Sequence, residues 1–97
     1  MAQRETGKMN ILVTHTFEEQ LKAVLDEMIA NKSQDAQKFK MYLDTILINM
    51  PTKAGKYKIS KFFDDEDVRD IEHEGFTIPF YHNKQKNTYL ILGIIKI

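Results

Sequence analysis

The sequence predicts an α+β protein in which a helical hairpin packs on a small antiparallel sheet, in the order β-α-α-β-β-β. Two observations favour this class. Apolar residues recur at helical spacing between residues 17 and 50. The second half of the chain changes to short β-branched and aromatic runs that turn residues separate. Helices and strands grouped in different parts of the chain are typical of α+β layers.

The first strand is predicted over residues 10–16, where the run NILVTHT is rich in β-branched residues. Thr16 stands three residues before Glu19, which is the spacing of a capping box, so the first helix is expected to begin there. Ser33 is expected to cap a second helix, which Pro51 ends. The apolar face of the first helix comprises Phe17, Leu21, Val24, Leu25, Met28 and Ile29, and that of the second comprises Ala36, Phe39, Leu43, Ile46, Leu47 and Met50.

Three strand-like runs follow, over residues 56–63, 75–82 and 88–97. The last run is apolar on both faces, so it is predicted to be a central strand. Pro79 cannot donate a hydrogen bond to a neighbouring strand. It therefore predicts a bulge, or a backbone position that faces outward.

Seven acidic residues and one arginine, Arg69, fall within residues 64–74. The run lacks the glycine and glutamate positions of an EF-hand loop, which argues against that calcium site. We therefore expect a solvated turn between strands, in which Val68 and Ile71 point inward. Arg69 is expected to anchor this turn through ion pairs with neighbouring carboxylates. The alternative is that Arg69 contacts a target.

Composition excludes several classes of protein. The 97 residues predict one domain over residues 9–97, preceded by a polar extension over residues 1–8. The absence of cysteine excludes disulfides and thiolate metal sites. No apolar run approaches the roughly 18 residues of a membrane helix, and no signal peptide is recognisable, so we expect a cytoplasmic protein without a membrane partner. A net charge of zero argues against strong non-specific binding to nucleic acid.

Cofactor and metal chemistry are not expected. The sequence has no glycine-rich phosphate loop and no G-x-S-x-G or S-x-x-K motif. The histidines lie far apart in the sequence and lack ligand spacing.

Two groups of residues are candidate binding surfaces. Lys56, Lys58 and Lys61 form a lysine row that could bind phosphate or could equally be an ordinary solvated face. Strand alternation would place Lys56 and Lys58 on one face and Lys61 on the other. Met28, Met41 and Tyr42 give the helices more apolar surface than a single sheet face needs, which favours a partner site. The alternative is that these three pack under the first strand.

The pattern resembles the RelE/ParE superfamily of toxins from bacterial type II toxin–antitoxin systems. MNILVTHTFEEQLKAVLDEM (residues 9–28) looks like its first strand and helix. KYKISKFFDDEDVRDIEHEGFTIPFY, followed by NTYLILGIIKI, looks like its sheet half. The resemblance implies a toxin that a cognate antitoxin neutralises by wrapping its helices and sheet. ParE-like members block DNA gyrase without cleaving anything, whereas RelE-like members cut messenger RNA in the ribosomal A site.

Within this resemblance, Lys58 matches one lysine of the RelE basic strand. The second basic position falls on Ser60, and the arginine expected after the Gly-aromatic pair falls on Thr77. The sequence given ends at Ile97, where an arginine and tyrosine tail would begin. A ParE-like gyrase toxin is therefore favoured over a RelE-like endoribonuclease that uses Lys58, and a degenerate, non-toxic partner-binding protein is the third possibility. The expected target contacts are Lys56, Lys58, Lys61 and Arg69.

Overall fold

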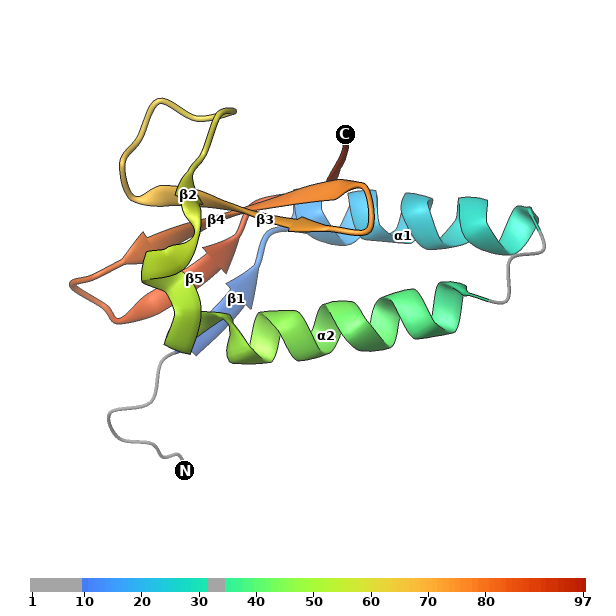
Figure 1. The fold of residues 1–97 in the computed structure, drawn as a ribbon, viewed down its shortest axis with the longest axis horizontal. Coiled ribbons are helices and arrows are strands. Elements are labelled where there is room, and N and C mark those ends of the chain that lie inside the picture. Colours follow the sequence, from blue (N-terminus) through green and yellow to red (C-terminus); the bar gives the residue numbers. More distant parts are fainter. Residues whose placement is uncertain (1–9, 32–34) are drawn as a thin grey trace.

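The computed structural model describes residues 10–31 and 35–97, so the predicted extension over residues 1–8 and the predicted Ser33 cap lie outside the described residues. The helices are α1 (His15–Ala30), α2 (Ala36–Lys53) and the short 3-10 helix η1 (Ala54–Lys56). The strands are β1 (Asn10–Val13), β2 (Lys58–Ile59), β3 (Val68–His73), β4 (Phe76–Asn83), β5 (Thr88–Ile91) and β6 (Ile95–Lys96). The α+β class is confirmed (Figure 1).

The sheet is mixed, and the expectation of a purely antiparallel sheet was wrong. Its order is β1-β5-β4-β3-β2, and β6 also pairs with β4. β1 runs parallel to β5, while the other pairs are antiparallel. Parallel neighbours need a long crossover, which the helices and the antiparallel strands between β1 and β5 supply. The central position predicted for the last apolar run is confirmed for β5, which lies between β1 and β4.

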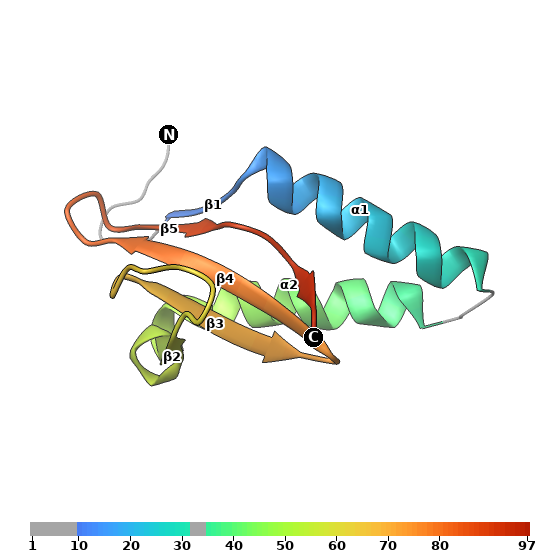
Figure 2. The ribbon, with the colours of Figure 1, turned by 90° about the horizontal axis from the view of Figure 1, so that it is seen from above.

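One face of the sheet forms the core together with the helices. The buried cluster joins strand residues to both helices and contains Phe17, Phe39, Leu43, Leu47, Met50, Ile71, Ile78, Phe80, Tyr89, Ile91 and Ile94. Burying each large apolar side chain contributes about 1.5–3 kcal/mol. α1 and α2 run beside each other, and their linked ends project beyond the sheet (Figures 1 and 2).

The helix ends differ from their predicted positions. Thr14, rather than Thr16, caps α1, because its Oγ1 accepts a hydrogen bond from the Phe17 amide at 3.0 Å. The same hydroxyl donates to the Leu92 carbonyl at 3.0 Å, so the cap also ties α1 to the chain after β5. Pro51 does not end α2 but lies in its last turn. The helix continues only to Lys53 and then tightens into η1.

The second half departs further from expectation. The predicted strand over residues 56–63 is reduced to two residues in β2, because η1 takes up its beginning and the chain bends after Ile59. Most of the predicted acidic turn is the strand β3, and only residues 64–67 remain a connection. Val68 and Ile71 are buried as expected, but they lie on opposite faces of a strand that is covered on both sides.

Pro79 marks the irregularity that its missing N–H predicts. Its carbonyl accepts from the Leu92 amide at 2.9 Å, on the side where β5 ends and β6 has not yet begun. The N–H that a proline lacks would face this break, so no regular ladder bond is lost. The predicted final strand over residues 88–97 is split here into β5 and β6.

Candidate functional site

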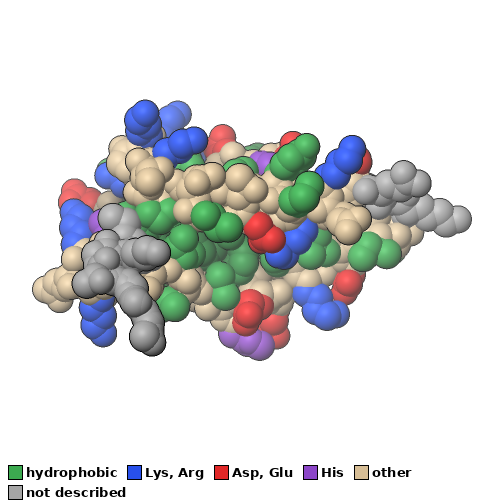
Figure 3. Space-filling view, turned by 90° about the horizontal axis from the view of Figure 1, so that it is seen from below, with side chains coloured by type: hydrophobic (Ala, Val, Ile, Leu, Met, Phe, Trp, Pro, Cys, Tyr) green, Lys and Arg blue, Asp and Glu red, His purple; other side chains and the backbone are tan. Residues whose placement is uncertain are grey.

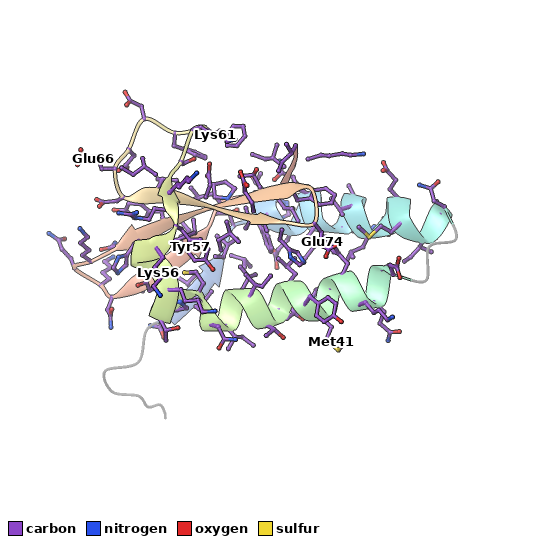
Figure 4. The ribbon with its side chains drawn as sticks, in the orientation of Figure 1. Met41, Lys56, Tyr57, Lys61, Glu66 and Glu74 are labelled. Atoms are coloured by element: carbon purple, nitrogen blue, oxygen red, sulfur yellow. The ribbon has the colours of Figure 1, made fainter. Side chains whose placement is uncertain are left out.

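The three predicted lysines line one cleft, called here the lysine cleft, which has a volume of about 530 Å³. Lys61 was expected on the opposite face from Lys56 and Lys58, and this was wrong. The strand ends at Ile59, after which the Lys61 amide donates to Asp70 Oδ2 at 3.1 Å and the chain folds back over β3. Lys56 and Lys61 lie toward the two ends of the segment that runs from η1 through β2 to the bend (Figure 4).

Two carboxylates share the lysine cleft. Asp70 pairs with Lys58 in the β2–β3 register, and Glu72 follows on the same face of β3. Lys61 Nζ lies 3.8 Å from Glu72 Oε2, an exposed pair that stabilises by about 0–1 kcal/mol. Asp70 is 8% exposed, and its Oδ1 is buried without a partner in the described chain. The cleft therefore presents positive and negative groups together.

Arg69 does not join the lysines. It pairs with Ile59 in the register, so its side chain leaves β3 on the face opposite to Asp70. Its Nη1 donates to the Tyr57 carbonyl at 2.5 Å, which ties β3 to the chain between η1 and β2. Within residues 10–31 and 35–97, no carboxylate forms an ion pair with Arg69. The expectation that ion pairs hold Arg69 was therefore wrong, because a backbone carbonyl does so.

The face that Arg69 occupies opens into a second hollow of about 600 Å³, called here the Arg69 pocket. Its wall includes His82, whose ring stacks on Tyr89 with centroids 4.2 Å apart and planes 5° apart. Burial raises the pKa of the Tyr89 hydroxyl. Gly55 and Ile59, which follow α2 in the sequence, also line the pocket. This pocket combines an arginine with an aromatic wall, a combination that sequence spacing alone did not indicate.

The predicted partner residues lie on two hollows of the helical surface. Met41 is 57% exposed and lines a groove of about 850 Å³ between α1 and α2, together with Leu25 and Ile29. Met28 and Tyr42 instead line a smaller hollow of about 430 Å³. Met41 points away from the sheet (Figure 4), which excludes packing under β1 for this residue. Seen from the side of α2, apolar side chains lie exposed among charged ones (Figure 3).

Other exposed apolar residues were not singled out from the sequence. Ile29 was expected in the core but is 63% exposed, because the end of α1 projects beyond the sheet. Ile48 is 70% exposed, and its position off the apolar stripe of α2 was the signal that could have found it. Phe62 and Phe63 are exposed on the connection after β2, where the predicted strand does not form.

The described part of the chain lacks two further features. Among residues 10–31 and 35–97, no group of three or more His, Asp or Glu side chains is arranged to hold a metal ion. In the same residues, neither helix has the length and apolar character that crossing a membrane requires.

Solved structures share this architecture at low sequence identity. The chromosomal ParDE TA system from P. aeruginosa matches with a TM-score of 0.72 over 92% of this chain and 96% of that chain, at 18% identity. The chain has the fold of the RelE/ParE toxins. The toxin–antitoxin complex RelBE2 from Mycobacterium tuberculosis matches with a TM-score of 0.56 at 10% identity, over 91% of this chain and 96% of that chain.

A metal-bound toxin from Helicobacter pylori is also similar in structure, with a TM-score of 0.60 at 19% identity, over 92% of this chain and 94% of that chain. No protein-family model and no curated protein matches the sequence. At these low sequence identities, the structural similarity supports a shared fold and nothing further.

Proposed function

We propose that the protein is the toxin of a type II toxin–antitoxin system, that it inhibits growth by binding DNA gyrase without catalysis, and that a cognate antitoxin neutralises it. The observation that carries the choice of target is the separation of Arg69 from the lysine cleft. Cleaving RNA requires proton-transfer groups and cations around one phosphate. Here β3 turns its arginine to the other face and places Asp70 and Glu72 among the lysines.

The lysine cleft is the proposed main contact with the target. Three lysines and two carboxylates line it, so it suits a protein surface that carries both signs of charge better than a uniformly negative backbone. Lys56, Lys58 and Lys61 contact the target in this proposal, and Arg69 makes a second contact from the other side of β3.

A RelE-like endoribonuclease is the second candidate, and one observation favours it. The bend after Ile59 brings Lys61 into the same cleft as Lys58, which places more positive charge at one point than strand alternation predicts. In that case Lys58 would stabilise the charge that develops on a scissile phosphate.

The groove between α1 and α2 is the proposed antitoxin site. Leu25, Ile29 and Met41 line it, and the exposed fractions of Ile29 and Met41 exceed one half. Exposed apolar surface of this kind marks partner sites, and a groove between helices accepts an amphipathic segment. Two of the solved structures with this fold are toxin–antitoxin systems, which supports the same kind of partner here.

Supercoiling by purified gyrase tests the proposed target directly. We expect the protein to inhibit supercoiling, and the double variant Lys56→Glu with Lys58→Glu to lose that inhibition. Lys86→Glu, in the turn between β4 and β5, is the control for a charge reversal outside the cleft. Full gyrase activity at saturating protein, together with cuts in translated messenger RNA, would establish the second candidate instead.

A further inference from the structure

We infer that the Arg69 pocket binds a carboxylate that a partner peptide carries beside an apolar or aromatic group. The inference rests on the proposed function in taking a protein as the partner. It deepens that proposal by assigning the chemistry that Arg69 recognises.

The guanidinium of Arg69 has donors to spare. It carries five N–H groups, and the Tyr57 carbonyl accepts from one nitrogen, Nη1. Arg69 is half-buried, yet none of its nitrogens belongs to the buried polar atoms of the described chain that lack a partner. The remaining nitrogens therefore keep some contact with solvent, and Arg69 lines the pocket. A planar guanidinium held at one corner is suited to bind a carboxylate through two parallel hydrogen bonds.

The charge of Arg69 is not neutralised by the acidic residues that border its pocket. Asp67 Oδ1 lies 3.7 Å from Lys84 Nζ, so this carboxylate has a different cationic partner. Glu66 is exposed, and its side chain points outward from the connection before β3 (Figure 4). Lys84 also lines the pocket, and with Glu66 and Asp67 it leaves the border without an excess of positive charge. Such a border suits a single carboxylate better than a chain of phosphates, which favours a peptide over nucleic acid.

The walls beside the arginine suit an apolar group. The His82 ring lies flat on Tyr89 at 4.2 Å, and Ile59 is 54% exposed on the same lining. Gly55 leaves space in the same lining, because a Cβ placed there would have no heavy atom within 4 Å. An anionic group at Arg69 would thus carry its neighbouring side chain into contact with aromatic and aliphatic surface.

Titration of the ¹⁵N-labelled protein with two small probes tests the chemistry. N-acetylphenylalanine carries a carboxylate beside an aromatic group, and N-acetylphenylalanine amide has the same body without the charge. We expect the acid to shift the amide signals of Gly55, His82 and Tyr89 in a saturable manner, and the amide probe to bind about tenfold more weakly or worse. Equal binding of both probes, or shifts confined to the lysine cleft, would overturn the inference.

Three variants separate the pocket from general effects of charge and folding. Arg69→Met should abolish saturable binding of the acid, while Lys58→Met, which removes the same charge from the lysine cleft, should leave it unchanged. Gly55→Phe keeps Arg69 and fills the space beside Gly55. It therefore tests the pocket even if Arg69→Met loses its native circular dichroism. Unchanged binding in Gly55→Phe, or a response to uridine 5′-monophosphate alone, contradicts the peptide carboxylate. The titration does not depend on gyrase. If the protein binds the acid saturably but does not inhibit gyrase, the proposed target is refuted and the inference about the Arg69 pocket stands.

Discussion

Gln20 Oε1 accepts a hydrogen bond from the Ile94 amide at 2.9 Å, so a side chain of α1 satisfies the backbone where the sheet changes from β5 to β6. The contact joins residues 74 positions apart in the sequence. Together with the Thr14 hydroxyl, which donates to the Leu92 carbonyl, it fixes the start of α1 against the break in the last strand. Gly93 lies between the two anchored backbone groups.

Gly93→Ala should destabilise the fold. A Cβ at this position would lie 2.6 Å from Gln20 Oε1. The Gln20 side chain must therefore move, and the hydrogen bond that it accepts from the Ile94 amide is lost. We expect the free energy of unfolding in urea to fall by about 1–2 kcal/mol. Gly55→Ala is the control, because its Cβ meets nothing within 4 Å and should leave stability equal or slightly higher. An equal loss in both variants would show that the close approach to Gln20 is unimportant.

Thr77→Val should stabilise the protein. Thr77 is fully buried in β4, and its Oγ1 has no hydrogen-bond partner in the described chain. Replacing this hydroxyl with a methyl group removes an unsatisfied polar atom and keeps a β-branched side chain, so we expect a gain of about 1 kcal/mol in chemical denaturation. Thr88→Val, at a half-buried position in β5, should change stability by less than about 0.5 kcal/mol. A clear loss in Thr77→Val would mean that the hydroxyl has a native partner.

The raised pKa of Tyr89 predicts a loss of stability at alkaline pH. Burial raises the pKa of its hydroxyl above the ordinary value of about 10. Below that pH the hydroxyl is neutral in both states. As the pH rises past about 10, the Tyr89 hydroxyl of the unfolded chain loses its proton first, so the unfolded chain binds fewer protons than the folded chain. The free energy of unfolding therefore falls until the folded hydroxyl also ionises.

Urea denaturation at pH 8 and pH 11 measures this effect in the wild type and in Tyr89→Phe. Other groups also titrate in this range, so the difference between the two proteins is the informative quantity. We expect the variant to lose less stability than the wild type between the two pH values. Parallel losses would indicate that the hydroxyl titrates alike in both states.

Met41→Lys should weaken the antitoxin complex without unfolding the protein. The side chain is 57% exposed and lines the groove between the helices, so a lysine there meets the partner and not the core. We expect the dissociation constant to rise about tenfold or more in calorimetry with the cognate antitoxin. Ile48→Lys is matched to it, because Ile48 is 70% exposed on α2 and does not line this groove. The groove is not the antitoxin site if Ile48→Lys weakens binding and Met41→Lys does not.

The sequence was sufficient to predict the helices and the centre of the sheet. Apolar spacing marked the buried side of α2, because Phe39, Leu43 and Leu47 meet one continuous sheet face. The run that became β5 was apolar on both faces, which indicated its central position. The sequence was not sufficient to predict β3, where the buried Asp70 accepts a hydrogen bond from the distant Lys61 amide. No local pattern encodes that tertiary contact.

The candidate site was predicted only in its residue types. Which lysines share a cleft depends on where β2 ends, and the early bend after Ile59 brings Lys61 into the same cleft as Lys58. The partner of Arg69 is a backbone carbonyl, which every residue carries, so spacing to acidic residues gave the wrong answer. The parallel pairing of β1 with β5 likewise depends on how distant segments meet, because both strands have ordinary apolar sequences.

We expect this protein to arrest growth by binding gyrase and not by cutting RNA. The most direct measurement is induced expression in bacteria, with a DNA-damage reporter and a map of transcript ends read from the same culture. We expect growth arrest with the reporter switched on and transcripts intact. Growth arrest with cuts inside translated codons and a silent reporter would contradict it, and would assign catalysis to the lysine cleft.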